Sequence, residues 1–311
     1  MNSQIKKINL NHSFIFFLFC NVFSVVVFKF TNLNISTLFC FLLILTIGVS
    51  HGALDHLKGK KLLTILNIKK FYIFYLIYIL LALSVILVWT IVPAITLIVF
   101  LAVASFHFGK EDTQFLINKN SNLISILYFF RGILIIITPL YFNFDETVTI
   151  FKMLLIDSEQ FYSSLGFIEK YKIIEIAIGL SALSSIILFL REFNIKKFAI
   201  FLDFFSIIIL NYYLSPLVAF TIYFCFLHSI RHTISLAIEM DNSNLKNGLK
   251  LFAQKAFPLT VLTAIFSVLG LYFLYNVYEL NSAILKIIFI GLASLTFPHI
   301  LLEYFLEKNE K

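Results

Sequence analysis

The chain has few charged residues. Only 13% of its 311 residues are charged, whereas soluble domains usually have about a quarter. Hydrophobic residues make up 60% of the chain, and the mean hydropathy is +0.95. About 20 apolar residues span a bilayer, where backbone polar groups must bond within their own helix. The long apolar runs therefore exclude an ordinary soluble domain and predict an all-α fold, a polytopic membrane helical bundle.

Cysteine is also scarce, and its placement argues against disulfide or thiolate chemistry. The three cysteines, Cys20, Cys40 and Cys225, each lie in an apolar run without CxxC spacing. This pattern favours inert packing over a disulfide or a thiolate-bound metal. No small-residue cleavage site follows the first apolar run, so we expect an uncleaved first helix.

Basic residues are in excess, but they do not form a nucleic-acid-binding pattern. The formal net charge of +7 lies in short loops, so it predicts membrane orientation and no nucleic-acid partner. We expect a multi-pass protein of the cell (plasma or inner) membrane with both termini in the cytoplasm. The residues that set this orientation are Lys6, Lys7, the stretch 58–70, Lys110, Lys119, the stretch 191–197, Lys246, Lys250, Lys255, Lys308 and Lys311.

Charges, prolines and Asn/Gly clusters divide the chain into about ten transmembrane helices. We expect residues 1–311 to form a single integral-membrane domain. Residues 143–170 mix charged and apolar side chains, which predicts an extracytoplasmic amphipathic loop at the membrane interface. Trp89 and Pro93 indicate an interfacial turn between the third and fourth spans. The expected spans are 13–30, 36–56, 70–91, 92–109, 122–141, 172–190, 197–213, 216–237, 256–277 and 283–304.

Six of the seven histidines fall inside these spans, and all six are on even-numbered ones. Even-numbered helices run in the same direction, and the histidines lie in their second halves, so we expect them to converge in the cytoplasmic half of the membrane. Ionisable groups inside a membrane are costly and usually mark a functional site. His12 precedes the first span and is expected to be solvated, and His56, beside a basic loop, to be structural. The converging residues are His51, His107, His228, His232 and His299.

The local spacing around these histidines is regular. His228 and His232 are four residues apart, so both can reach one metal from one helix face. An acid follows three other histidines at the same spacing, as Asp55, Glu111 and Glu303. A metal-bound imidazole usually gives its other N–H to a carboxylate, so each acid can support its own histidine or a neighbour's. Arg231 is expected to pair with Asp112 or Glu111, or to extend toward the membrane surface.

An all-imidazole ligand set suits iron, copper or zinc and argues against calcium or magnesium. Neutral ligands leave the charge of the ion uncompensated, which favours a ferrous ion that activates O2. The aromatic neighbours of the histidines suit a long apolar, polyene-like substrate. These candidate substrate-pocket residues are Phe106, Phe108, Tyr223, Phe224, Phe226 and Phe297.

Four motifs contain these histidines: GVSHGALDHL (48–57), FHFGKED (106–112), HSIRH (228–232) and FPHILLE (297–303). Their order across about ten spans resembles the Brp/Blh family of membrane-bound β-carotene 15,15′-dioxygenases. RGILIIITP (131–139) is similar to a further family feature. Ser50 is a departure, because the family pattern has proline before the first motif histidine.

The resemblance implies O2-dependent cleavage of the central double bond of β-carotene to two all-trans-retinal molecules at a non-haem Fe(2+). Its implied iron ligands are His51, His107, His228 and His232. Asp55 and Asp112 would be supporting acids, and Glu111, His299 and Glu303 are weaker candidates for that role. A retinal-binding rhodopsin in the same membrane is the implied functional partner.

Other functions compete with this interpretation. A membrane di-iron desaturase or hydroxylase generally needs about eight histidines, including adjacent pairs, and this chain has no HH pair. A haem protein with axial histidines is a further alternative. A metal or small-molecule transporter would spread polar residues through the membrane depth. An opsin-like protein would need a retinal-linking lysine deep in the last helix, whereas Lys286 lies near its start.

Overall fold

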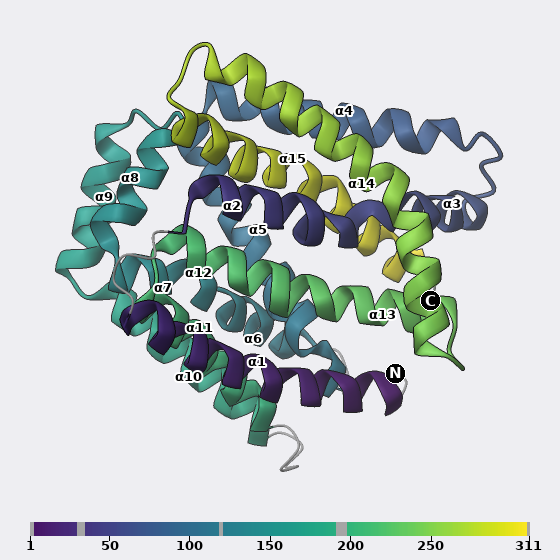
Figure 1. Ribbon diagram of the computed structural model, residues 1–311, viewed down its shortest axis with the longest axis horizontal. Helices are drawn as coiled ribbons and strands as arrows, with labels where there is room; N and C mark the ends of the chain where they lie inside the picture. The colour runs from purple at the N-terminus through teal and green to yellow at the C-terminus, as the bar shows by residue number, and fades with distance from the viewer. Residues whose placement is uncertain (1–2, 30–34, 118–120, 191–197, 310–311) are drawn as a thin grey trace.

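The computed structural model describes residues 3–29, 35–117, 121–190 and 198–309, and these residues form only helices, turns and loops (Figure 1). In this part of the chain, nine helical segments are long and apolar enough to cross a membrane, and α11 is a shorter apolar helix. The prediction of an all-α membrane bundle is confirmed. The basic stretch 191–197, Lys119 and Lys311 lie outside the described residues.

The first half of the chain supplies five of the nine long apolar segments. Two of them, 37–65 and 122–142, are each built from several consecutive helices. The elements are α1 (Ser3–Lys29), α2 (Thr37–Leu43), η1 (Ile44–Gly48), η2 (Val49–Leu54), α3 (Asp55–Ile65), α4 (Tyr72–Ile91), α5 (Pro93–Thr113), η3 (Gln114–Leu116), α6 (Asn122–Gly132) and α7 (Leu134–Phe142).

The second half supplies the other four long segments, with α11 between the first and second of them. The segment 216–240 combines three consecutive helices. The elements are α8 (Phe144–Met153), α9 (Glu159–Lys170), α10 (Ile173–Leu190), α11 (Ala199–Tyr213), α12 (Pro216–Ile222), η5 (Tyr223–Ser229), α13 (Ile230–Met240), α14 (Leu245–Tyr275) and α15 (Leu280–Asn309).

The turns between closely spaced helices lie where proline predicts them, but several helices are longer than expected. Pro93 begins α5 directly after α4, and Pro216 begins α12 two residues after α11 ends. The second span was expected to end at residue 56, whereas the helical segment continues to Ile65. Charged side chains mark the edge of the apolar layer, but lysine is a good helix former, so the helix continues past that edge.

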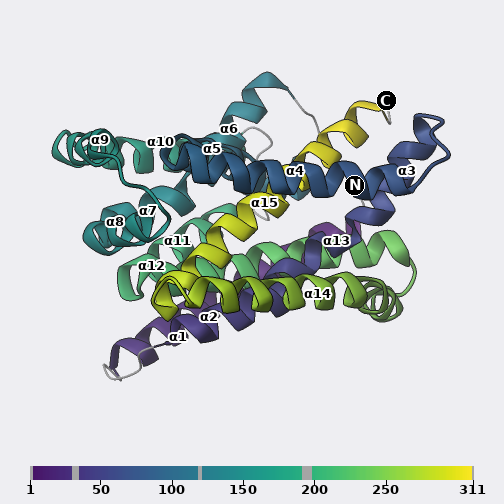
Figure 2. The same cartoon turned by 90° about the horizontal axis from the view of Figure 1, so that it is seen from above.

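Residues 143–170 form two helices, α8 and α9, at the end of the bundle opposite to the start of α1 and the end of α15 (Figures 1 and 2). Trp89 is fully buried, and its Nε1 donates to the carbonyl of Leu154 at 2.9 Å. The turn that Trp89 and Pro93 indicate is confirmed between α4 and α5, with Trp89 buried inside the bundle, and its interfacial depth stays a prediction. The Lys286 ammonium donates to the carbonyl of Met153. Side chains from α4 and α15 thus hold the end of α8.

The turn between α13 and α14 is closed by Asp241. Its carboxylate accepts hydrogen bonds from the side chain of Asn247 at 2.7 Å and from the hydroxyl of Ser243 at 2.7 Å. These bonds, with others from the backbone of the turn, lower the pKa of Asp241 to about 2. The turn therefore keeps its charged, hydrogen-bonded form at neutral pH.

Two glycines let α5 and α6 approach each other closely. A Cβ on Gly109 would collide with the carbonyl oxygen of Tyr128, and one on Gly132 would collide with that of Ser105. The two collisions are reciprocal, and both are with backbone, which cannot move aside as a side chain can. This contact sets the position of α5, which contains His107 and Asp112.

Two segments depart from α-helical geometry and meet each other. Both η1 and η5 are π-helical, and the Ser229 hydroxyl on η5 donates to the carbonyl of Gly48 on η1 at 3.2 Å. A Cβ on Gly48 would lie 2.6 Å from the ring of Phe224, so glycine is needed there. Short π-helical turns occur frequently at functional sites.

We predict that Gly109→Ala and Gly132→Ala each destabilise the protein by about 1–3 kcal/mol or more, because an extra methyl group in a packed contact forces backbone shifts. Thermal unfolding in detergent measures the effect. Gly179→Ala on α10 is the matched control, because no atom lies within 4 Å of the added Cβ. Equal unfolding temperatures for all three variants would contradict the close-contact explanation.

Candidate metal centre

Four of the candidate histidines lie together inside the bundle. The ring centroid of His107 is 5.3 Å from that of His228 and 5.3 Å from that of His299, and His232 lies 5.7 Å from His299. All four side chains are buried. They come from α5, η5, α13 and α15. The backbone of His51 is in η2, and its side chain lies outside the described part of the structure.

His228 is held by an acid and a tyrosine. Its Nδ1 lies 3.2 Å from Oδ1 of Asp112, and the Tyr223 hydroxyl donates to Oδ2 of the same carboxylate at 2.5 Å. Because a carboxylate only accepts, Nδ1 carries the proton. This arrangement fixes the tautomer and the ring orientation, as in metal-bound histidines whose other nitrogen bonds a carboxylate.

His299 has the same kind of support from a different pair of helices. Its Nδ1 lies 2.8 Å from Oδ1 and 2.9 Å from Oδ2 of Asp55, and the Tyr78 hydroxyl donates to Oδ2 at 2.8 Å. Asp55 was expected to support His51, four residues earlier. Among the described side chains it supports His299, which lies 244 positions away.

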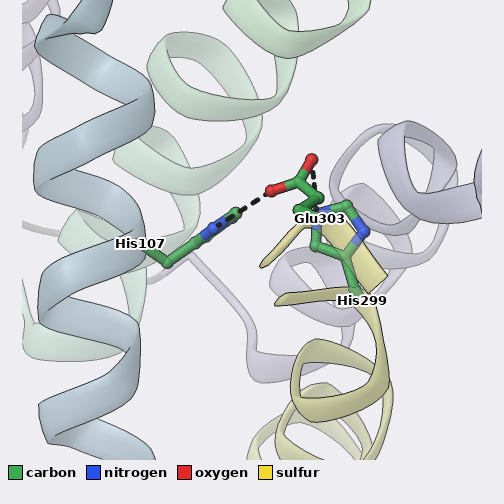
Figure 3. Close-up of side chains that lie close together, drawn as sticks. All are labelled: His107, His299 and Glu303. Carbon is green, nitrogen blue, oxygen red and sulfur yellow. Dashed lines mark ion pairs between the residues drawn. The ribbon is translucent and has the colours of Figure 1, made fainter. Parts of the chain in front are cut away.

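The other two acids, Glu111 and Glu303, also contact histidines on neighbouring helices. Oε2 of Glu111 lies 3.1 Å from Nδ1 of His232, not against His107 on its own helix. The carboxylate of Glu303 lies between His107 and His299, 3.8 Å and 3.6 Å from their nearest nitrogens (Figure 3). Side chains four residues apart on a helix point in the same direction, so an acid from a facing helix reaches the far nitrogen of a ring more directly.

Arg231 lies between the two histidines of HSIRH and makes a buried ion pair. Its guanidinium forms two hydrogen bonds to Asp203 on α11, at 2.8 and 2.9 Å. It also donates to the main-chain carbonyl of Asp112 at 3.1 Å and to the hydroxyl of Ser13 on α1. The expected pairing of Arg231 with a side chain of Asp112 or Glu111 is therefore wrong. The contacts of Arg231 thus join four helices, α13, α11, α5 and α1.

His12 and His56 lie outside the cluster of four rings. His12 was expected to be solvated, but it lies within the apolar helix α1 and its Nδ1 is buried. His56 is half-buried, and its Nδ1 bonds the carbonyl of Ala53 at 3.0 Å in its own helix. The hydrogen bond of His56 agrees with a structural role.

A cavity of about 300 Å³ reaches the cluster. His107, His228 and His299 line it, together with Phe108, Phe224 and residues of α4 and α14. A second cavity of about 90 Å³ shares four lining residues with the first: Phe108, Phe224, Leu292 and Thr296.

The four other candidate pocket residues line neither of these two cavities: Phe106, Tyr223, Phe226 and Phe297. A Cβ added at Gly52 would meet no atom within 4 Å, so close helix contact does not require glycine there. Gly52 borders the larger cavity instead.

Two groups of three potential ligand atoms share Glu303 within the described residues. One is His107, His299 and Glu303, and the other is Glu111, His232 and Glu303. A shared carboxylate suits two metal ions. The Lys58 ammonium, however, lies 2.7 Å from Oε1 of Glu303 and 3.5 Å from Nε2 of His232. Lys58 thus already neutralises Glu303 in the second group, which favours a single metal ion.

Comparison with known proteins identifies the family. The family profile described as β-carotene 15,15′-dioxygenase matches residues 42–307. The chain belongs to the β-carotene 15,15′-dioxygenase family. It is 28% identical over 270 residues to a protein named β-carotene 15,15′-dioxygenase from an uncultured marine bacterium, 66A03, covering 84% of this chain and 90% of that protein. No solved structure matches this chain.

Family membership agrees with the motif resemblance and with the local chemistry. Lys286, which lies near the start of the last helix, is buried and donates to Ser282 at 2.7 Å and to the carbonyl of Met153. Its contacts are those of a structural residue. For this β-carotene 15,15′-dioxygenase family member, the buried histidines and acids are the candidate metal-binding groups.

We predict that Arg231→Met destabilises the protein by about 3–5 kcal/mol, because Asp203 is left as an unpaired buried charge. Unfolding in detergent, followed by circular dichroism, measures this. The double variant Arg231→Met/Asp203→Leu should lose less stability than either single variant. A double variant as unstable as the sum of the two single variants would show that the charges do not depend on each other.

Proposed function

We propose that this protein cleaves the central 15,15′ double bond of β-carotene with O2 to give two molecules of all-trans-retinal. One β-carotene and one O2 balance two retinals. The observation that carries the proposal is a cluster of four buried imidazoles, three of which line an apolar cavity, in a chain of the β-carotene 15,15′-dioxygenase family.

The proposed cofactor is Fe(2+), held by His51, His107, His228 and His232. The donor set fits this ion, since imidazole is a good ligand for iron and carboxylates fix the orientation of His228 and His232. Bound ferrous iron would supply the activation of O2. The buried Arg231–Asp203 ion pair, with the hydrogen bond from Arg231 to the carbonyl of Asp112, would hold α13, α11 and α5 together around it.

The cavities support a long apolar substrate. Central cleavage requires substrate on both sides of the reacting bond, and the two cavities meet at Phe108 and Phe224, whose rings contact His228. The ring of Phe224 is nearly parallel to that of His228, at 5.8 Å. These rings would align the polyene beside the metal and exclude water.

In the cell, we propose, this chain is a multi-pass protein of the plasma or inner membrane with both termini in the cytoplasm. An apolar substrate would reach it from the bilayer, and the retinal produced would serve a rhodopsin in the same membrane. The basic residues of α3, at the same end of the bundle as the start of α1 and the end of α15, support this orientation.

The proposed reaction is tested by expressing the protein in cells that accumulate β-carotene and measuring carotenoid loss and retinal by chromatography. We expect retinal to form with two molecules per β-carotene consumed. Alanine at His107, His228 or His232 should reduce bound iron by more than about tenfold and abolish retinal formation. His12→Ala is the control, because His12 lies outside the cluster.

Three outcomes would reject parts of this proposal. Well-folded, iron-loaded protein that leaves β-carotene intact would reject the reaction. Normal iron content after two of the three histidine substitutions would reject the ligand set. Apocarotenals longer or shorter than retinal would reject cleavage at the central bond.

We further predict that substrate enters between α4 and α14. The larger cavity is lined there by side chains that are also exposed on the outer face of the bundle, such as Ile79 (56%) and Phe266 (63%). Leu262→Trp should narrow this opening and raise the KM for β-carotene several-fold, with iron content unchanged. Leu269→Trp is the control, because Leu269 is exposed on the same helix and does not line the cavity. Equal kinetics for both variants would exclude this route.

A further inference from the structure

His299 is positioned in the same way as His228, which is among the proposed iron ligands. Each ring has Nδ1 against an aspartate, and each aspartate accepts a hydrogen bond from a tyrosine hydroxyl. The tyrosines and aspartates come from different helices in the two cases. Because the carboxylate fixes the proton on Nδ1, the electron pair on Nε2 of each ring is directed away from the aspartate.

The Nε2 atom of His299 faces the centre of the cluster. His107 and His299 each offer a nitrogen, and Glu303 offers an oxygen, within 4.8 Å of one another (Figure 3). Two nitrogens that are each about 2.1 Å from the same ion lie at most about 4.2 Å apart. Small side-chain movements therefore suffice for His107 and His299 to bind one ion.

Unlike the two aspartates, Glu303 pairs with a lysine. Its carboxylate lies between the two rings, and Oε1 accepts a hydrogen bond from Lys58 at 2.7 Å. An ion bound by the two imidazoles would take the place between the rings, and Lys58 would keep the displaced carboxylate beside the centre. The negative charge of Glu303 would then balance the ion without occupying a coordination position.

We propose that His299 is a fifth imidazole ligand of the metal, binding through Nε2, and that Asp55 and Tyr78 are its positioning residues. This inference rests on the iron site of the proposed function. Five imidazoles around a six-coordinate ion leave one position, which is enough for O2 because a hydrocarbon substrate needs none. The site then admits O2 while it excludes a second small ligand.

The test uses the purified full-length protein in detergent, with Co²⁺ as the probe metal. We expect His299→Ala to weaken Co²⁺ binding by more than about 100-fold and to change its visible absorption. Exogenous imidazole should restore both, because it fills the space that the side chain leaves. Asp55→Asn should weaken binding about 10–100-fold, since an amide can donate to Nδ1 and move the ring proton to Nε2. X-ray absorption of the iron-loaded protein should count one imidazole fewer in His299→Ala.

His56→Ala is the matched control, because His56 borders the same cavity and bonds its own helix. Unchanged Co²⁺ affinity and absorption in His299→Ala would overturn the inference. If His299→Ala does not fold, Asp55→Asn is the deciding variant, and wild-type Co²⁺ affinity in that variant overturns the inference equally.

Carotenoid cleavage separates this inference from the proposed function. A wild-type protein that binds Co²⁺ through His299 but makes no retinal removes only the proposed function, whereas retinal formation with metal binding independent of His299 removes only this inference.

Discussion

Burying ionisable side chains in an apolar bundle is the constraint on which this structure depends. A charge transferred into lipid without a partner costs several kcal/mol, so each such group needs a hydrogen-bonded counterpart. Arg231 and Asp203, Lys58 and Glu303, and the imidazole–carboxylate pairs all meet this need across helix boundaries. The same pairs therefore hold the bundle together and fix the orientations of the histidine rings.

The helices come close enough for these side chains to pair only because small residues lie where two helices meet. Gly109 and Gly132 remove side chains from the contact between α5 and α6, and Gly48 makes room for Phe224. Apolar burial provides no net attraction between helices in lipid, so close packing and interhelical hydrogen bonds supply it. Glycine placement and the polar network are thus both needed for the helices to associate in lipid.

The sequence was sufficient to predict the helical bundle, its turns at Pro93 and Pro216, and the family. It also predicted that histidines distant in the chain would meet, because the direction of each helix follows from the number of spans before it. It did not predict which acid supports which ring, since spacing along one helix carries no information about the facing helix. Asp55 and His299, 244 positions apart, are such a pair. Asp203 had no motif around it, and only its ion pair with Arg231 on another helix reveals its role.

The π-helical turn from Tyr223 to Ser229 determines what a one-residue deletion in this part of the chain would do. A π-helical turn contains one residue more than an α-helical turn, and each residue rotates an α-helix by about 100°. Deleting one residue from this turn would let it close as an α-helical turn, so the later residues of α13 would keep their neighbours. The side chains that would be re-oriented are those of the turn itself, His228 among them, so the extra residue contributes to the position of this proposed iron ligand.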